Sequence, residues 1–263
     1  MKNDLRKYDK TYQASRLVLT PLFKMAYHPM ILNKENIPKN GPAILCGNHL
    51  HVWDQVPVIC STDRVIHWMA KKEYFESKLA WMYKLTGCIP VDREGDASIA
   101  KNSAEEYLKD GAVVGIFPEG TRNQYQVAKN KLDELYSLYP FLKNEDGNNI
   151  KSDEIAKLFE QKKMLLERMQ QQEQVYSDKG VVINKEDELL TFHFGAVSMA
   201  RKTDAFVVPF AVNGNYKMNN DNLIVNFGEA YKVESDDLEF EKDKLQKKVA
   251  VLIKENKKFT RKR

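Results

Sequence analysis

The chain alternates short apolar runs with longer segments whose apolar residues recur at helical spacing. The runs have the length of strands and occupy residues 42–45, 65–70, 88–91, 112–116, 205–212 and 223–227. The segments that predict helices are residues 55–60, 74–85, 98–108, 195–202 and 237–256. An apolar run of this length fits a buried strand, whereas a longer stretch with helical spacing fits an amphipathic helix. We therefore expect an α/β protein, a layered αβα domain with a central β-sheet as its core.

The N-terminal part of the chain departs from this alternation. Residues 8–32 mix basic and apolar positions, and they predict one or two short helices broken at Pro21 and Pro29. We treat residues 1–38 as an N-terminal helical segment. Its apolar face either docks on the core of the domain or dips into the headgroup layer of a membrane.

A second departure lies in the middle of the chain. Between residues 124 and 188 glycine becomes rare and glutamines cluster, and residues 152–174 predict a charged amphipathic helix. We interpret residues 124–188 as a helical insertion into a main domain of residues 39–263. The expected role is a solvated excursion that carries no chemistry.

Length and composition favour an intracellular globular protein. With 263 residues and 43% hydrophobic residues, the chain can bury a sizeable core. Its three cysteines show no paired metal-binding spacing, so we expect neither disulfides nor a zinc site. The start lacks the apolar stretch of a secretory signal. Residues 17–32 are too short and too interrupted to span a bilayer, which needs about 20 mostly apolar residues.

The net charge of +4 conceals an uneven distribution. Basic residues are in excess in residues 1–28 and again in residues 241–263, whereas the middle of the chain is acidic. Two basic ends fit an anionic membrane surface, to which each Lys or Arg contributes about 1 kcal/mol. Nucleic acid is an alternative partner for the basic tail, but the chain lacks the interleaved aromatic and basic residues of a stacking surface. We expect a cytoplasmic protein peripherally associated with the inner face of the cell membrane, with no nucleic acid bound.

Candidate chemistry begins at the end of the first core strand, where His49 and Asp54 follow residues 42–45. Histidine exchanges protons near neutral pH, and a carboxylate bonded to its other ring nitrogen fixes the tautomer. A five-residue separation places two side chains about 140° apart on a straight helix, so the pair meets only if His49 lies in the turn before the helix. The alternative is that Asp54 caps the helix and His49 is a polar turn residue. His51 is a neighbour that fits a pocket wall or a support.

A second polar cluster follows the run at residues 112–116. Glu119, Gly120, Thr121 and Arg122 stand directly after this strand, and the guanidinium of the arginine can hold an anion with several donors. Gly120 permits a backbone turn that other residues resist. Alternatively, Glu119 and Arg122 form only an ion pair in an ordinary loop.

Arg93 is a further candidate for an anion contact, because it follows the extended piece at residues 88–91. The alternative is a surface arginine paired with Asp92 or Glu94. Two other histidines, His28 and His67, sit among apolar residues, and we expect both to be structural.

Together these motifs resemble the glycerolipid acyltransferase family typified by bacterial 1-acyl-sn-glycerol-3-phosphate acyltransferase. The resemblance covers residues 41–122 and 190–228, and it depends on two motifs, Asn-His-x4-Asp and Phe-Pro-Glu-Gly-Thr-Arg. It implies that residues 39–263 form an acyltransferase domain of phospholipid biosynthesis. The implied reaction moves a fatty acyl group from acyl-CoA or acyl carrier protein to the free hydroxyl of 1-acyl-sn-glycerol 3-phosphate, which gives phosphatidic acid.

The resemblance also implies roles for individual residues. His49 is the general base and Asp54 its orienting partner. Arg93 contacts the glycerol phosphate, and residues 119–122 bind the acceptor that carries the phosphate. No metal or other cofactor is implied beyond the acyl donor. The alternatives left open are glycerol 3-phosphate or another lysophospholipid as acceptor, or a peripheral membrane protein without catalytic activity.

Two positions depart from the pattern of the family. Family members often carry a serine directly after the Phe-Pro-Glu-Gly-Thr-Arg motif, where this chain has Asn123. They also carry a Phe-Lys-x-Gly segment, where this chain has His193 in place of the lysine, after the long insertion. Both changes lie beside the predicted acceptor site, so the identity of the acceptor is the least determined part of the prediction.

Overall fold

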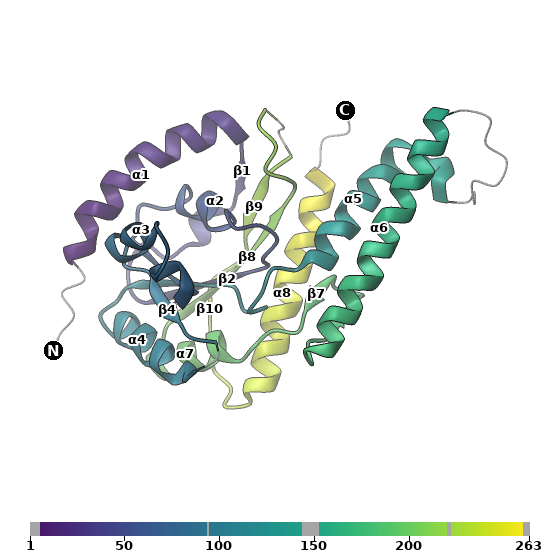
Figure 1. Cartoon of the computed structure of the whole chain (residues 1–263). Helices are drawn as coiled ribbons and strands as arrows, with labels where there is room; N and C mark the ends of the chain where they lie inside the picture. The colour runs from purple at the N-terminus through teal and green to yellow at the C-terminus, as the bar shows by residue number, and fades with distance from the viewer. Residues whose placement is uncertain (1–5, 94, 144–152, 220–221, 260–263) are drawn as a thin grey trace. The chain divides into compact units, whose positions relative to one another are not determined.

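The computed structural model describes residues 6–93, 95–143, 153–219 and 222–259, and it divides into two compact units (Figure 1). Unit 1 combines Met1–Thr121 with Phe192–Arg263 and contains the central sheet. Unit 2 is Arg122–Thr191 and is mainly helical. The range predicted for the insertion, residues 124–188, falls inside unit 2.

The sheet of unit 1 has the strand order β1-β9-β8-β2-β5-β3-β4, with β10 paired to β8. Its strands are β1 (Met30–Leu32), β2 (Ala43–Gly47), β3 (Ile66–Lys71), β4 (Ile89–Val91), β5 (Val113–Ile116), β8 (Phe206–Asn213), β9 (Ile224–Phe227) and β10 (Tyr231–Lys232). Strands β8, β2, β5, β3 and β4 are parallel to one another, whereas β9 and β10 run antiparallel to β8. The α/β expectation is confirmed, and the carboxyl ends of the parallel strands share one edge of the sheet.

Helices cover the sheet of unit 1 on both faces. These helices are α1 (Arg6–Tyr27), α2 (Gln55–Ile59), α3 (Ala80–Leu85), α4 (Ala97–Lys109), α7 (Gly195–Thr203) and α8 (Leu238–Phe259), with 3-10 turns at Lys34–Asn36 and Lys72–Phe75. Phe23 of α1 and Val58 of α2 join the core on the face that carries Leu45 and Phe210. Helices α4, α7 and α8 pack on the opposite face. The layered αβα prediction therefore agrees with the structure.

Within the N-terminal segment, Arg6–Tyr27 forms one continuous helix, so the prediction of a break at Pro21 was wrong. Proline in a helix interior costs about 3 kcal/mol because it removes a hydrogen bond and crowds the preceding turn. Pro21 lies on the exposed side of α1, whereas Tyr12 and Phe23 are buried on the other. Packing of that inner face outweighs the local cost, since most helical stability in proteins comes from tertiary contacts. The chain after Pro29 forms β1, not helix.

The helix predicted for residues 74–85 is also shorter than expected. A 3-10 turn at Lys72–Phe75 is followed by α3, which begins only at Ala80. Between them the hydroxyl of Ser77 donates to the carbonyl of Tyr74 at 2.8 Å and accepts from the amide of Leu79 at 3.2 Å. A serine that bonds to nearby backbone groups in this way competes with helical hydrogen bonds.

Unit 2 is built on two helices, α5 (Gln124–Leu138) and α6 (Asp153–Asp178). A 3-10 turn at Pro140–Lys143 and the short strands β6 (Ile183–Asn184) and β7 (Leu189–Leu190) complete it. The amphipathic prediction anticipated α6 but not α5. Leu132 and Leu135 of α5 pack with Leu142 and Leu165 in a core of their own. The hydroxyl of Tyr176 ties the start of the unit together, because it accepts from the amide of Gln124 and donates to the carbonyl of Arg122.

Candidate active site

Asn48 fixes the turn that follows β2 to the neighbouring strand β8. Its buried side chain donates from Nδ2 to the carbonyl of Val212 at 3.0 Å and accepts at Oδ1 from the amide of Val212 at 2.8 Å. The pairing of β2 with β8 ends at Gly47 and Phe210, so the side chain continues the ladder one step further. The backbone that carries His49 therefore starts from a fixed position.

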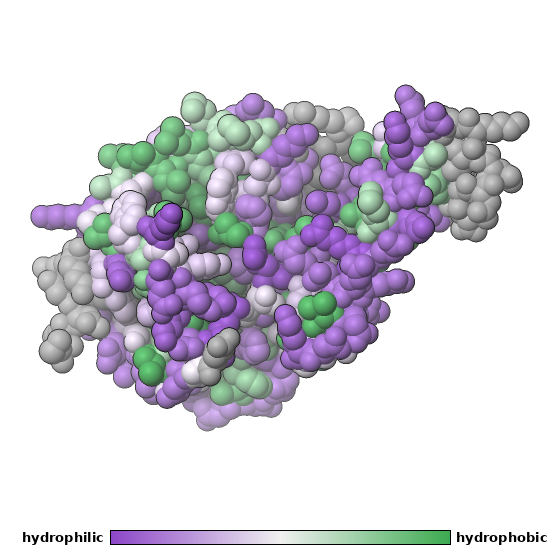
Figure 2. Space-filling model, in the orientation of Figure 1, coloured by the Kyte–Doolittle hydropathy of each residue, from purple (hydrophilic) through white to green (hydrophobic). Residues whose placement is uncertain are grey.

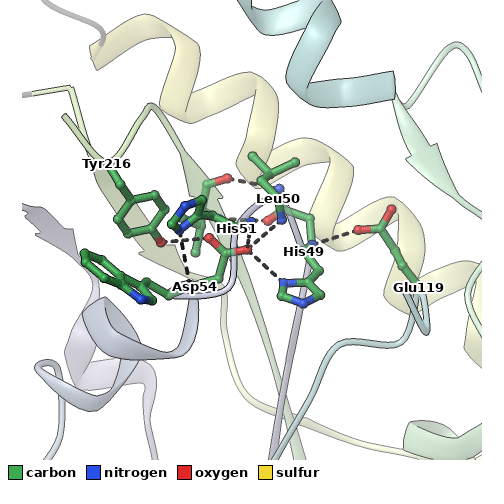
Figure 3. A network of polar contacts seen from close by, with 9 residues as sticks. His49, Leu50, His51, Asp54, Glu119 and Tyr216 are labelled. Carbon is green, nitrogen blue, oxygen red and sulfur yellow. Dashed lines mark hydrogen bonds and ion pairs between the residues drawn. The ribbon is translucent and has the colours of Figure 1, made fainter. Parts of the chain in front are cut away.

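Asp54 is fully buried and organises the loop between β2 and α2 (Figure 3). Its Oδ2 accepts from the amides of Leu50 at 2.6 Å and His51 at 2.7 Å, and it lies 2.9 Å from His49 Nδ1. Asp54 occupies the N-cap position of α2, but its side chain makes no capping bond to that helix. The alternative in which Asp54 only caps α2 is therefore wrong, because the carboxylate bonds to the loop before the helix.

Three contacts fix the position of His49, and they involve Phe117, Glu119 and Asp54. The ring stacks on Phe117, with centroids 4.1 Å apart, and the backbone amide donates to Glu119 Oε1 at 2.8 Å. A carboxylate at Nδ1 favours the tautomer with its proton on that nitrogen, which leaves the lone pair on Nε2. The side chain of His49 is 18% exposed, whereas that of Asp54 is 0% exposed. The arrangement can take a proton from a hydroxyl that approaches Nε2.

The loop after β5 approaches the same turn through Glu119, which is buried. Gly120 has a φ of +68°, a left-handed conformation that favours glycine, as expected for this position. A Cβ at Gly120 would lie 2.9 Å from Nε2 of His193. The backbone amide of His193 also donates to the carbonyl of Pro118 at 2.9 Å. The histidine that replaces the expected lysine thus lies directly against the Phe-Pro-Glu-Gly-Thr-Arg motif, at Pro118 and Gly120.

The two arginines predicted to bind phosphate are both exposed. Arg93 follows the carboxyl end of β4, in a loop where Asp92 binds Lys72 at 3.0 Å and the amide of Gly95 at 2.9 Å. Arg122 is the first residue of unit 2. Their contacts with the acceptor stay a prediction.

The departure at Asn123 has a local explanation within unit 2. Asn123 is the N-cap of α5, and its Oδ1 accepts from the amide of Gln126 at 2.9 Å. Serine and asparagine are both strong N-cap residues. The replacement of serine by asparagine therefore keeps the start of this helix capped.

Three other histidines that the sequence singled out lie at different places in unit 1. His67 is buried in β3 and bonds through Nδ1 to the carbonyl of Gly87, and burial lowers its pKa, as suits a structural residue. His28 is exposed at the end of α1 with a φ of 42°. His51 stacks on Tyr216 with centroids 4.4 Å apart, in the supporting position that the sequence suggested.

Sequence reasoning missed Tyr216, whose hydroxyl donates to Asp54 Oδ1 at 2.7 Å. The residue lies just after β8, so it has the same setting as His49 after β2 and Glu119 after β5. A polar aromatic residue beyond a buried parallel strand was the available signal. It gave no indication of the partner, because Asp54 is 162 positions away in the chain.

The class of the protein follows from comparison with known families. The acyltransferase family model matches residues 29–213, which is more than half of the chain. The chain therefore belongs to the acyltransferase family, as its motifs suggested.

Particular relatives make the similarity more specific. The chain is 34% identical over 99 residues to the 1-acyl-sn-glycerol-3-phosphate acyltransferase of Bacillus subtilis (strain 168), and 31% identical over 98 residues to that of Borreliella burgdorferi. These matches cover 37% and 36% of this chain and 50% and 39% of the relatives. The chain thus spans about half the length, or less, of the curated relatives that it matches.

The fold is similar to that of a solved enzyme. The crystal structure of the 1-acyl-sn-glycerophosphate (LPA) acyltransferase PlsC from Thermotoga maritima aligns with a TM-score of 0.60. The alignment covers 97% of this chain and 83% of that chain at 16% identity. At this identity the likeness supports the fold.

Proposed function

We propose that the protein transfers a fatty acyl group from a thioester donor to the free hydroxyl of 1-acyl-sn-glycerol 3-phosphate, giving phosphatidic acid. The observation that carries the proposal is the hydrogen bond of 2.9 Å between His49 Nδ1 and Asp54 Oδ2. It leaves Nε2 available at the carboxyl edge of the sheet, where ligands of α/β proteins bind. The names of the two bacterial relatives support this acceptor.

The proposed reaction needs no protein nucleophile. Nε2 of His49 removes the proton of the acceptor hydroxyl as its oxygen attacks the carbonyl carbon of the thioester. The new C–O bond forms a tetrahedral oxyanion, whose collapse breaks the C–S bond and expels the thiolate. The imidazolium, stabilised by Asp54, then gives the proton to the sulfur. Acyl-CoA and acyl carrier protein both supply such a thioester, and the balanced reaction requires no metal or other cofactor.

The acceptor phosphate needs cationic partners, and the proposal assigns this role to Arg93 and Arg122. Guanidinium groups match phosphate oxygens with paired donors. Glu119, Gly120 and Thr121 complete the proposed acceptor site. The carboxylate of Glu119 also holds the neighbouring loop, because it accepts from the amide of His49. Holding the acceptor in place contributes to rate as well as affinity.

A lipid acceptor suggests that the protein works at a membrane surface. The outer face of α1 exposes Leu17, Val18, Leu22 and Met25, each by more than half. Figure 2 shows hydrophobic residues gathered in the region where Figure 1 places this helix. Such a face suits insertion into the headgroup region, helped by basic residues near anionic lipid. Within the described residues, no helix is long and apolar enough to cross a bilayer.

The test is a purified assay that offers both acyl donors to several acceptors. Transfer to 1-acyl-sn-glycerol 3-phosphate is expected to exceed transfer to glycerol 3-phosphate and to lysophospholipids with larger headgroups. The substitution His49→Gln should abolish the transfer while leaving the thermal unfolding midpoint nearly unchanged. Near-normal turnover by this variant would remove His49 as the base, and no turnover by the wild type with any pair would favour a non-catalytic membrane protein.

A further inference from the structure

Both oxygens of the Asp54 carboxylate are engaged, and they have different partners (Figure 3). Oδ2 faces the loop, where it accepts from the amides of Leu50 and His51 and meets His49 Nδ1. Oδ1 accepts from the hydroxyl of Tyr216 at 2.7 Å. Contacts at both oxygens fix the rotation of the carboxylate group about the bond to its Cγ. The orientation of Oδ2 toward His49 is therefore set by the contact at Oδ1 together with the two backbone amides at Oδ2.

The ring of Tyr216 is itself held by four aromatic neighbours, one of which is Phe23 with its centroid 6.4 Å away. It stacks on His51 with an interplanar angle of 23° and meets Tyr27 and Trp53 edge-on, with centroids 6.0 and 6.3 Å away. Tyr27 belongs to α1, Trp53 to the loop before α2, and Tyr216 follows β8. Three segments of unit 1 thus place one hydroxyl at a buried carboxylate. Because packing fixes the rotamer of the ring, the hydroxyl of Tyr216 is already in position to donate to Asp54.

Tyr216 also keeps the proton that makes it a donor. Burial, followed by the adjacent Asp54 carboxylate, raises its pKa well above the usual value for a phenol. The hydrogen bond to Oδ1 therefore persists through the neutral and mildly alkaline range. The other titratable groups around Tyr216 and Asp54 are His49, His51, Glu119 and Tyr27.

We infer that Tyr216 is a positioning residue for acyl transfer, acting on His49 through the Asp54 carboxylate. The inference rests on the proposed function, in which His49 is the base. Without the hydroxyl, Oδ1 loses its donor in a site too buried for water to replace it freely. The carboxylate can then rotate, and the bond to His49 Nδ1 weakens. The binding of substrate has no direct dependence on this contact.

The first test separates kcat from KM in the variant Tyr216→Phe, which keeps the ring and removes only the hydroxyl. We expect kcat to fall about tenfold or more, the usual effect of losing a hydrogen bond to a charged group, with KM for the acceptor changed less than about twofold. The matched control is Tyr27→Phe, which removes a hydroxyl from the neighbouring ring and should leave kcat nearly unchanged. A kcat for Tyr216→Phe equal to that of the control would overturn the inference.

A double-mutant cycle tests whether the effect passes through Asp54. In the background of Asp54→Asn, the further change Tyr216→Phe should lower kcat by less than about twofold, because the coupled partner is already gone. Equal losses in both backgrounds would assign the effect to packing instead. Thermal unfolding of all variants identifies any that lower activity by loss of folded protein, and kcat is then normalised to the folded fraction.

A readout without turnover keeps this inference apart from the proposed function. The His49 Nδ1 proton, bonded to a carboxylate, is expected to give a downfield proton resonance that disappears in Asp54→Asn. In Tyr216→Phe the resonance should shift or broaden, whereas in Tyr27→Phe it should stay in place. An unchanged resonance in Tyr216→Phe contradicts the positioning role. A changed resonance in a protein that transfers no acyl group contradicts the proposed function alone.

Discussion

Asn48 shows how a single side chain determines where a reactive group lies. It is fully buried and makes two hydrogen bonds to one residue of the adjacent strand. The partner, Val212, is 164 positions away, so only the folded sheet brings them together. The meeting of His49 with Asp54 could be predicted, because a strand before the motif places the histidine in a turn. The contributions of Asn48 and Tyr216 could not, since both depend on the position of β8 beside β2.

The substitution Asn48→Ala should destabilise the protein by about 2–4 kcal/mol, because it leaves the buried amide and carbonyl of Val212 without their side-chain partner. It should also lower kcat, since the turn that carries His49 loses its anchor. Urea denaturation followed by circular dichroism measures the first effect. Asn102→Ala on the exposed side of α4 is the control and is expected to be nearly neutral. Equal stability of the two variants would contradict the anchoring role.

Two substitutions of Glu119 test whether its carboxylate oxygen or its charge supports the turn that carries His49. Glu119→Gln keeps an oxygen that can accept from the amide of His49, whereas Glu119→Ala removes it. We expect the glutamine variant to retain much more activity than the alanine variant. The same ordering should hold in the thermal unfolding midpoints. Equal loss of activity in both variants would mean that the charge of Glu119, not its acceptor oxygen, is what matters.

At the scale of elements, α1 shows the limit of local sequence patterns. The predicted break at Pro21 followed the propensity of proline, but Tyr12, Phe23 and Tyr27 form a stripe on one side of a single helix. Side chains on the same helix secure it further, since Arg16 pairs with Asp63 at 2.6 Å and Thr11 donates to the carbonyl of Leu85. These partners are distant in the chain and leave no local signal. Helix α5 was missed as well; its buried leucines pack with Leu142 and Leu165 within unit 2.

Replacing Pro21 with alanine should stabilise the protein by roughly 1–3 kcal/mol, because alanine restores a backbone donor inside α1 and relieves crowding. The residue is exposed, so no core contact is lost. The thermal unfolding midpoint measures the gain. Pro38→Ala, outside any helix, serves as the control and should bring no comparable increase. A lower midpoint for Pro21→Ala would indicate that the helix requires the proline.

The hypothesis that the protein binds a membrane depends on the exposed apolar face of α1. Substitutions on this face test the hypothesis better than truncation does. Removal of residues 1–32 would also delete β1, which pairs with β9. Leu17→Gln combined with Leu22→Gln and Met25→Gln should instead abolish flotation with anionic liposomes at low salt, because the apolar face is lost. Ile99→Gln, at a similarly exposed site in α4, should leave flotation unchanged. Undiminished flotation of the triple variant would remove α1 as the docking element.

At the scale of the whole molecule, buried phenols link stability to alkaline pH. Burial is the largest cause that raises the pKa of Tyr12, Tyr107 and Tyr231. These three side chains come from α1, α4 and β10, so the effect involves three separate elements of unit 1. In the unfolded chain a phenol ionises near pH 10. Above that pH the unfolded state binds fewer protons than the folded state, so the free energy of unfolding falls as pH rises.

We therefore expect stability to be independent of these tyrosines below about pH 9 and to fall steeply from about pH 10 upward. Denaturation curves at successive pH values measure the slope. Tyr231→Phe removes one of the ionisable groups and should make the decline shallower. A decline that begins well below pH 9, or one unaffected by this variant, would assign alkaline instability to other groups.

The order of the sheet has a consequence for how the protein is made. Strand β2 lies between β5 and β8, yet the whole of unit 2 is translated between those two partners. During synthesis β2 therefore presents an apolar strand edge until residues 206–213 have left the ribosome, and such edges promote aggregation. Slower translation prolongs this interval, whereas chaperone binding covers the edge during it. The yield of folded protein from a cell should accordingly depend more on chaperone supply than on the stability of the finished molecule.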